Sequence, residues 1–563
     1  MICIRTAVLA TTLIPIGAAL AALAAPRALA EPPSAASAAA PAAAPARPAS
    51  TPTPPTATGV VLPDRAARSE QRRALCESDP RVVLGQVTLD VCLGAELFFR
   101  ETFDGNGRTC GSCHPAQNNY TLDPDFIAGL PDNDPLFIAE QDAELSQLEL
   151  PELLHDSALI LVNADGLDDP THKFVMRSVS HMLGLNTSTT PPRLEEGSTR
   201  HATDGTLLPP LGRLGWGGDG APGNGELRDF ADGAIVQHMT RSLDRVEGVD
   251  FDLPTDEERD EIAAFSGTIG RMNEVEMSAV SLSDRAAERG RNAFLTGNGQ
   301  ECAIRCHVNA GANSLTRDAN GDPIGGLENS SFDIGTALVR LPRVDELDIP
   351  LDGGFGLGPH LDLDGDGELD SFGNGGMNVA PLIEAADTAP MFHSNAFATL
   401  EDAIGFYASE DFAHSFVAST IDFTNRGFGE AMPLTPRDIS DIGRFLRVVN
   451  GSLNCQMAAY RLRAAAEITE ARGDHERHVP LGLVALAAAE IDDALDVLGA
   501  VRRLNPRAQS LLRDARQALG RARQCDSRQR LRHLRAAIER VEEADRSLGC
   551  GLEMQLGQGT LMF

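Results

Sequence analysis

A motif in the first quarter of the chain, formed by Cys110, Cys113 and His114, constrains the fold more than any other feature. The order C-x-x-C-H places the two cysteines one helical turn apart, so both thiols face the same side. This pattern is the attachment signature of a c-type haem, in which the thiols form thioethers to the haem vinyl groups and the histidine binds the iron. A disulfide or half of a zinc site would use the cysteines but would not explain the histidine. The motif therefore predicts a covalent haem with His114 as proximal ligand.

A second motif, formed by Cys302, Cys306 and His307, has one more residue between its cysteines. A turn that bulges can still present both thiols on one side. Both motifs follow a phenylalanine-containing stretch and a Gly-Asn-Gly turn, which are 96–99 with 105–107 and 292–295 with 297–299. Such an internal repeat predicts a second haem with His307 as proximal ligand. A disulfide-forming pair beside a surface histidine is the alternative.

The N-terminal residues predict export. Residues 1–5 form a basic start, residues 6–25 are largely apolar and Ala-Leu-Ala at 28–30 fits a cleavage site, so residues 1–30 are expected to be a secretory signal peptide. The mature protein is then expected in the periplasm or another exported location. An uncleaved membrane anchor is the alternative, because the apolar run is about 20 residues long. No later stretch is apolar enough to span a bilayer, so no membrane contact is expected beyond this segment.

The remaining cysteines are expected to pair, because an exported protein meets oxidising conditions. Cys76 and Cys92 are close in sequence and are expected to form a local bridge. Cys455, Cys525 and Cys550 lie in the C-terminal part of the chain. One bridge and one free thiol are expected there, unless a pair crosses domains.

The charge of the chain limits its partners. The formal charge is −33, which argues against nucleic acid and against an anionic membrane surface. A basic redox protein would be attracted to such a surface. The alternative is that the acidity only keeps an exported protein soluble.

The composition divides the chain into segments. Residues 31–64 are rich in Ala, Pro, Ser and Thr and predict a disordered linker. The residues after it are too many for a single core. Helical segments separated by loops rich in Gly, Pro and Asp predominate, so the predicted fold class is mainly α. One of these helices is expected to start with Thr435 as N-cap and Pro436 as its first residue. Residues 451–563 predict a helical bundle without a ligand pattern.

Three segments together resemble the di-haem cytochrome c peroxidase and MauG family. They are the stretch from Leu93 to His114, the second cysteine motif, and D-T-A-P-M-F-H at 387–393 followed by A-T-L-E at 398–401. The resemblance implies two cytochrome-c-like haem domains, here residues 65–280 and 281–450. It implies that the N-terminal haem reacts with hydrogen peroxide and that the C-terminal haem takes electrons from a small cytochrome or cupredoxin. It also implies a tryptophan between the haems and a nearby calcium ion.

The only tryptophan of the chain, Trp216, lies between the two motifs in the sequence. Its segment, G-W-G-G-D-G at 215–220, resembles the W-D-G-R-A segment of the family. Trp216 is therefore expected to be the aromatic residue between the haems. The alternative is that it only fills the core.

The chain departs from the family where the distal catalytic glutamate is expected. Counted from the tryptophan, that position falls near Gln237, His238 and Met239, where no carboxylate is present. Cleavage of peroxide needs a group that moves a proton to the leaving oxygen. His238 can supply this proton transfer, can bind the first iron from its distal side and block peroxide, or can be an ordinary helix histidine. These three alternatives stay open.

The distal ligand of the second iron is also unsettled by sequence. Met377 is the nearest sulfur to the segment that holds the family ligand, and a methionine ligand would suit an electron-entry haem. Met391 and His393 are further candidates. A methionine that only fills a gap in the core is the alternative.

An acidic loop predicts a calcium site. Its carboxylates alternate and a glycine stands in the middle, as in a calcium-binding loop, and they are Asp362, Asp364, Asp366 and Asp370. The twelfth position is Gly373 and not glutamate, which would weaken binding. An ordinary acidic surface loop is the alternative.

The sequence as a whole predicts an exported di-haem c-type cytochrome that acts as a peroxidase-type oxidoreductase. His114 would hold the peroxide-reactive iron, His307 the electron-entry iron, and Trp216 would lie between them. The main alternative is a non-catalytic electron-transfer cytochrome in which both irons have six ligands. A third reading is a gas or redox sensor with the C-terminal bundle as its output.

Overall fold

The computed structural model describes residues 65–164, 166–167, 173–189, 200–201, 207–208, 214–218, 220, 226–312, 331–356, 359–361, 371–420, 422–424 and 427–563. The predicted signal peptide (1–30), the predicted linker (31–64) and the predicted calcium loop, with Asp362, Asp364, Asp366 and Asp370, lie outside these residues. One compact unit comprises Arg68–Phe563. None of the helices formed by the described residues has both the length and the apolar character needed to cross a membrane.

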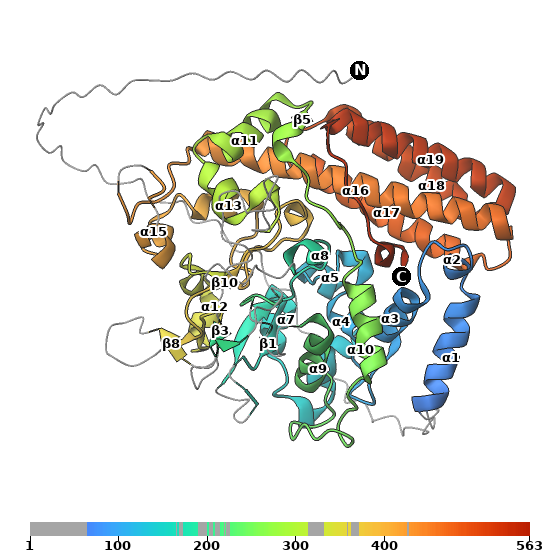
Figure 1. Cartoon of the computed structure of the whole chain (residues 1–563), viewed down its shortest axis with the longest axis horizontal. Helices are drawn as coiled ribbons and strands as arrows, with labels where there is room; N and C mark the ends of the chain where they lie inside the picture. Colours follow the sequence, from blue (N-terminus) through green and yellow to red (C-terminus); the bar gives the residue numbers. More distant parts are fainter. Residues whose placement is uncertain are drawn as a thin grey trace, which may run out of the picture. The chain divides into compact units, whose positions relative to one another are not determined.

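The fold is mainly α, as the sequence predicts (Figure 1). The longer helices are α1 (Arg65–Ser78), α3 (Leu89–Arg100), α9 (Leu227–His238), α10 (Asp256–Ser266), α11 (Arg285–Thr296), α16 (Pro436–Arg472), α17 (His478–Gly499), α18 (Pro506–Ala522) and α19 (Ser527–Leu548). The shorter helices are α2 (Pro80–Val83), α4 (Cys110–Cys113), α5 (Pro124–Ala128), α6 (Ile138–Gln141), α7 (Pro151–Ser157), α8 (Leu185–Ser188), α12 (Pro342–Glu346), α13 (Leu400–Phe406), α14 (Glu410–Ala413) and α15 (Phe416–Thr420).

The strands are short and form small separate sheets. The antiparallel pairs are β1 (Leu159–Val162) with β2 (Val175–Ser178), β3 (Arg200–His201) with β4 (Leu207–Leu208), β5 (Ser281–Leu282) with β11 (Gly549–Cys550), and β6 (Ser331–Phe332) with β10 (Met377–Asn378). A three-stranded sheet has the order β7 (Leu351–Asp352), β9 (Ser371–Phe372), β8 (Pro359–Leu361). In the first pair Leu159 lies opposite Ser178, which sets the position of the β2 end near the site described below.

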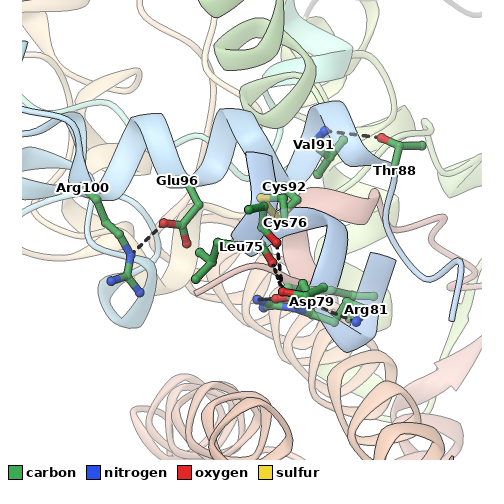
Figure 2. The surroundings of a disulfide bond; sticks show 12 residues. Leu75, Cys76, Asp79, Arg81, Thr88, Val91, Cys92, Glu96 and Arg100 are labelled. Carbon is green, nitrogen blue, oxygen red and sulfur yellow. Dashed lines mark hydrogen bonds and ion pairs between the residues drawn. A yellow bond between two sulfur atoms is a disulfide. The ribbon is translucent and has the colours of Figure 1, made fainter. Parts of the chain in front are cut away.

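The helix before the first motif, α3, is fixed from two sides. Cys76 of α1 and Cys92 of α3 form the predicted disulfide, so that prediction is confirmed (Figure 2). On its other side α3 packs against α10. A Cβ atom added to Gly94 would lie 1.8 Å from the main-chain oxygen of Glu261, so only glycine permits this close approach. Helix α10 begins with a capping box of Thr255 and Glu258.

The second motif has a matching frame. Helix α11 precedes it and packs against α16. A Cβ atom added to Gly290 would lie 1.8 Å from the main-chain oxygen of Asp441. Helix α16 also begins with a capping box, formed by Thr435 and Asp438, with Pro436 in its first turn. The predicted start of this helix is thus confirmed.

The C-terminal helices pack on one another and continue the same core. Helix α16 packs against α17 and α19, and α18 packs against α17 and α19; these helices lie together in Figure 1 in orange to red. One apolar core runs from Cys92 of α3 to Leu548 of α19. Helix α16 has no break at residue 450, where the sequence places a domain boundary. Cys455 and Cys525 are free thiols, whereas Cys550 forms a disulfide with neither of them. No bridge therefore joins two members of the C-terminal trio, and the alternative of a pair that leaves the trio holds instead.

Candidate functional site

The first motif forms a single helical turn that ends at its histidine. Ser112 Oγ accepts the N–H of Thr109 at 3.0 Å, which fixes the start of α4. The Nδ1 atom of His114 lies 2.8 Å from the main-chain oxygen of Tyr120. This contact assigns the proton to Nδ1 and leaves Nε2 unprotonated. A histidine held in this way by a carbonyl is typical of a metal ligand.

The second motif reaches the same end geometry by a wider turn. Residues Cys302–Cys306 form one π-helical turn, and the His307 N–H donates to the Cys302 carbonyl at 2.6 Å. The wider π-helical turn accommodates the extra residue of this motif. After it, the backbone dihedral angles of His307 (φ −115°, ψ 59°) nearly equal those of His114 (φ −119°, ψ 61°). His307 Nδ1 lies 3.0 Å from the main-chain oxygen of Ala380. Both histidines are therefore oriented by a carbonyl.

The cysteines of the two motifs are not used in disulfides. No disulfide joins Cys110 to Cys113 or Cys302 to Cys306. Burial raises the pKa of the Cys110 and Cys302 thiols to about 12, so both cysteines carry their S–H protons at neutral pH. The disulfide alternative for either motif is not supported in this fold.

Each motif borders its own cavity with a largely apolar lining. The cavity at the first motif is lined on other sides by α9 and by residues 177–182, and the cavity at the second motif by residues 377–382 and 388–395. The two cavities share one wall, made of residues 178–181 and Trp216. Trp216 Nε1 donates to the Ser178 carbonyl at 2.8 Å, so the indole is held in this wall.

The motif residues fit a haem better than a bare metal ion. Over the described ranges, no group of three or more His, Cys, Asp or Glu side chains is arranged to hold a metal ion by itself. A haem needs only one protein nitrogen for its iron, since the porphyrin supplies four more, and two thiols for its vinyl groups. An oriented histidine, two unbridged cysteines and an apolar cavity meet these needs at both motifs.

His238 ends α9 and lines the first cavity. Burial, with the nearby charges of Arg108 and Arg245, lowers the pKa of His238 to about 3, so the imidazole is neutral at ordinary pH. Its Nδ1 atom lies 3.9 Å from Glu149 Oε1. A carboxylate is thus present beside His238, although the sequence around that residue contains none.

Glu149 belongs to a buried ion pair. Arg108 Nη1 donates to Glu149 Oε1 at 2.8 Å, and both side chains are 1% exposed. The Leu161 N–H donates to the other carboxylate oxygen at 2.9 Å. Sequence reasoning missed Glu149 because it stands in no motif and is held beside His238 only by its contacts with Arg108 and the Leu161 N–H.

His181 was also missed. It lies in the wall between the cavities and lines both of them. Its Nδ1 atom is buried and has no hydrogen-bond partner in the described part of the chain. Burial lowers the pKa of this imidazole. His181 is recognised as a candidate site residue only from its place after β2, in the same wall as Trp216.

The residues that the sequence predicts as distal ligands of a second haem share one cavity. Met377, Met391 and His393 all line it, and Met377 is 6% exposed. Met432 lies there too, with its sulfur 3.7 Å from the sulfur of Cys302. The His393 ring lies 6.4 Å from the Trp216 ring, in an edge-on arrangement. The fold therefore brings the predicted candidates together and adds Met432 to them.

A buried ion pair supports the wall from behind. Arg177, the residue before the wall, donates two hydrogen bonds to Asp352, at 2.6 and 2.8 Å. Both side chains are almost fully buried. Two parallel bonds to one carboxylate fix the guanidinium plane, which holds the end of β2 in place.

Comparison with models of protein families gives no match, and comparison with curated proteins gives none either.

Proposed function

We propose that the protein is an exported di-haem c-type cytochrome that reduces hydrogen peroxide, with electrons entering at the second haem. It would be a divergent member of the di-haem cytochrome c peroxidase and MauG family. The observation that carries this proposal is the equal orientation of His114 and His307, each beside two cysteines and an apolar cavity, with Trp216 in the wall between. The proposed haem domains are residues 65–280 and 281–450, and α16 continues from the second of them into the helical bundle of residues 451–563.

The repeated frame supports two haem domains. Gly94 and Gly290 each allow the helix before a motif to contact a later helix through its main chain, and both later helices begin with a capping box. A duplicated unit explains why two distant segments of one chain have the same packing.

Four cysteines and two histidines would hold the cofactors. Cys110 and Cys113 would each add a thiol S–H across a haem vinyl group, as would Cys302 and Cys306, and His114 and His307 would bind iron through Nε2. Haem supplies an iron that changes its oxidation state and can take a small ligand. The apolar linings of the cavities exclude water around the bound groups.

His238 is the proposed proton carrier of the first cavity. Reduction of one hydrogen peroxide to two water molecules takes up two electrons and two protons. A neutral imidazole can take the proton from one peroxide oxygen and give it to the other, which leaves as water. The lowered pKa of His238 leaves its imidazole neutral before peroxide arrives, with a nitrogen lone pair that can accept a proton.

The electrons would come from a redox protein, a small cytochrome or a cupredoxin. They would move from the second haem to the first through the wall that the two cavities share. Trp216 offers the only indole of the chain in that wall, and its hydrogen bond to Ser178 keeps the ring in position. The strongly acidic charge of the chain favours a basic partner. Calcium binding by Asp362, Asp364, Asp366 and Asp370 is a further part of the proposal.

A second candidate function has an observation in its favour. His181 has a buried nitrogen without a hydrogen bond, and His238 faces the first cavity. Either imidazole could bind the iron opposite His114, and the protein would then be an electron-transfer cytochrome that does not react with peroxide. Mass spectrometry, which counts the attached haems, and addition of peroxide to the oxidised protein test the two parts of the proposal separately.

A further inference from the structure

We propose that Glu149 and His238 act as one acid–base pair, in which His238 faces the first cavity and Glu149, behind it, positions the imidazole. The inference rests on the proposed peroxidase function and deepens it. The sequence near His238 lacks the carboxylate that the family resemblance implies, and Glu149 supplies a carboxylate beside the His238 imidazole from another segment of the chain.

The pair is assembled from three distant segments. Glu149 precedes α7, His238 ends α9, and Arg108 stands just before the first motif. Glu149 Oε1 lies 3.9 Å from His238 Nδ1 and also accepts a hydrogen bond from Arg108. The second carboxylate oxygen is held by the Leu161 N–H. The carboxylate is thus fixed on two sides and presents one oxygen to the imidazole.

The backbone of His238 is held by the same segment. Asn106 Nδ2 donates to the His238 carbonyl at 3.0 Å, and Arg108 Nη1 lies 3.5 Å from that carbonyl oxygen. Arg108 therefore contacts both members of the pair. A displacement of Glu149 would therefore change the position of His238 both directly and through the Arg108 guanidinium.

The arrangement fixes which nitrogen does chemistry. A carboxylate beside Nδ1 favours the tautomer with its proton on Nδ1, so that Nε2 carries the lone pair. When Nε2 takes a proton, the Glu149 carboxylate opposes the positive charges of Arg108 and Arg245 that disfavour the imidazolium, and the gap of 3.9 Å can close to a hydrogen bond. In the reaction one proton goes from a peroxide oxygen to Nε2 and then to the leaving oxygen. Glu149 stays ionised throughout, as an orienting carboxylate does in other acid–base pairs.

Hydrogen cyanide tests the pair without turnover. At neutral pH it must lose its proton to bind iron as cyanide, so a base in the cavity speeds binding. We expect Glu149→Gln to slow cyanide binding by about tenfold or more, because the amide no longer favours the right tautomer. The rate is measured by stopped-flow absorbance on protein that mass spectrometry shows to carry two haems. An unchanged rate in Glu149→Gln would overturn the inference.

A matched control is available on the same part of the fold. His155 Nε2 lies 2.8 Å from Glu140 Oε1, and both side chains are partly exposed. Glu140→Gln therefore removes a carboxylate from a histidine that does not line the cavity. Its cyanide-binding rate should equal that of the wild type. An equal slowing in both variants would contradict a specific role for Glu149.

A double variant separates positioning from support of the fold. Glu149→Gln leaves the buried charge of Arg108 without its carboxylate, so the melting temperature is expected to fall. The variant Arg108→Gln/Glu149→Gln removes both charges and should recover stability while cyanide binding stays slow. Recovery of the wild-type rate of cyanide binding would show that Glu149 only balances the buried charge of Arg108, and this result would overturn the inference. Absence of haem or of any cyanide binding in the wild type would instead contradict the proposed function.

Discussion

Gly94 of α3 contacts the main chain of α10 in the same way that Gly290 of α11 contacts the main chain of α16. At each position an added Cβ would lie 1.8 Å from a carbonyl oxygen, that of Glu261 or that of Asp441. The two contacts fix the helices from which the chain enters the two cysteine motifs. The equal spacing is the clearest sign in the packing that the two halves are built alike.

Replacement of either glycine should separate these helices. Gly94→Ala and Gly290→Ala are each expected to reduce the free energy of unfolding by about 2 kcal/mol or more, because a methyl group cannot be accommodated against a carbonyl. Gly482→Ala in α17 is the control, since no atom lies within 4 Å of its added Cβ. That change should stabilise the helix by about 1 kcal/mol. Thermal unfolding measures all three, and a loss at Gly482 equal to that at Gly94 would contradict the packing.

Asp493 in α17 should make stability depend on pH. Burial and the nearby charges of Asp387 and Glu490 raise its pKa from 3.8 to about 9. Between these values the folded protein keeps a proton that the unfolded chain has lost, so stability falls as pH rises, by up to about 1.4 kcal/mol per pH unit. Asp493→Asn mimics the protonated form.

This variant is therefore expected to raise the melting temperature more at pH 8 than at pH 5. Asp514→Asn, on the exposed side of α18, is the control and should give the same small change at both pH values. Equal gains for Asp493→Asn at the two pH values would show that its carboxyl titrates normally.

Two haems should be found on the exported protein. Mass spectrometry is expected to show two haem additions in the wild type and one in Cys302→Ala/Cys306→Ala, since the π-helical turn presents both thiols of the second motif. The first motif should stay loaded in that variant. A single addition in the wild type would show that the five-residue turn is not a haem-attachment site.

Trp216→Phe should slow the transfer of electrons between the cavities and leave the first cavity intact. The indole lies in the shared wall, and phenylalanine keeps a ring but loses the hydrogen bond to Ser178. Re-reduction after one equivalent of peroxide, followed by stopped-flow absorbance, should be slower than in the wild type. Cyanide binding at the first iron is the internal control and should not change. An unchanged rate of re-reduction would exclude Trp216 from the path.

Much of the frame could be predicted from local sequence patterns. The start of α16 follows from Thr435 and Pro436, and the Cys76–Cys92 bridge follows from two nearby cysteines in an exported chain. These features depend on residues close in sequence, where capping and loop closure decide the outcome. The mainly α class follows in the same way from the scarcity of strand signals.

The surroundings of the cavities could not be predicted, because they depend on residues far apart in the chain. Glu149 is held beside His238 by Arg108 and by the Leu161 N–H of β1. His181 reaches both cavities only because β2 ends at the shared wall. Neither residue stands in a pattern with a chemical meaning of its own. The bridge expected within the C-terminal trio does not form either: Cys455, buried in α16, and Cys525 are free, and Cys550 is bonded to neither of them.

Electron paramagnetic resonance of the oxidised and the half-reduced protein, with and without calcium, tests the central claim most directly. The account predicts a high-spin ferric signal from the iron at His114 in at least one of these states, and loss of that signal when hydrogen peroxide is added. Two low-spin signals in every state, unchanged by peroxide, would mean that both irons have six firm ligands. The protein would then be an electron carrier, and the proposed peroxidase function would be wrong.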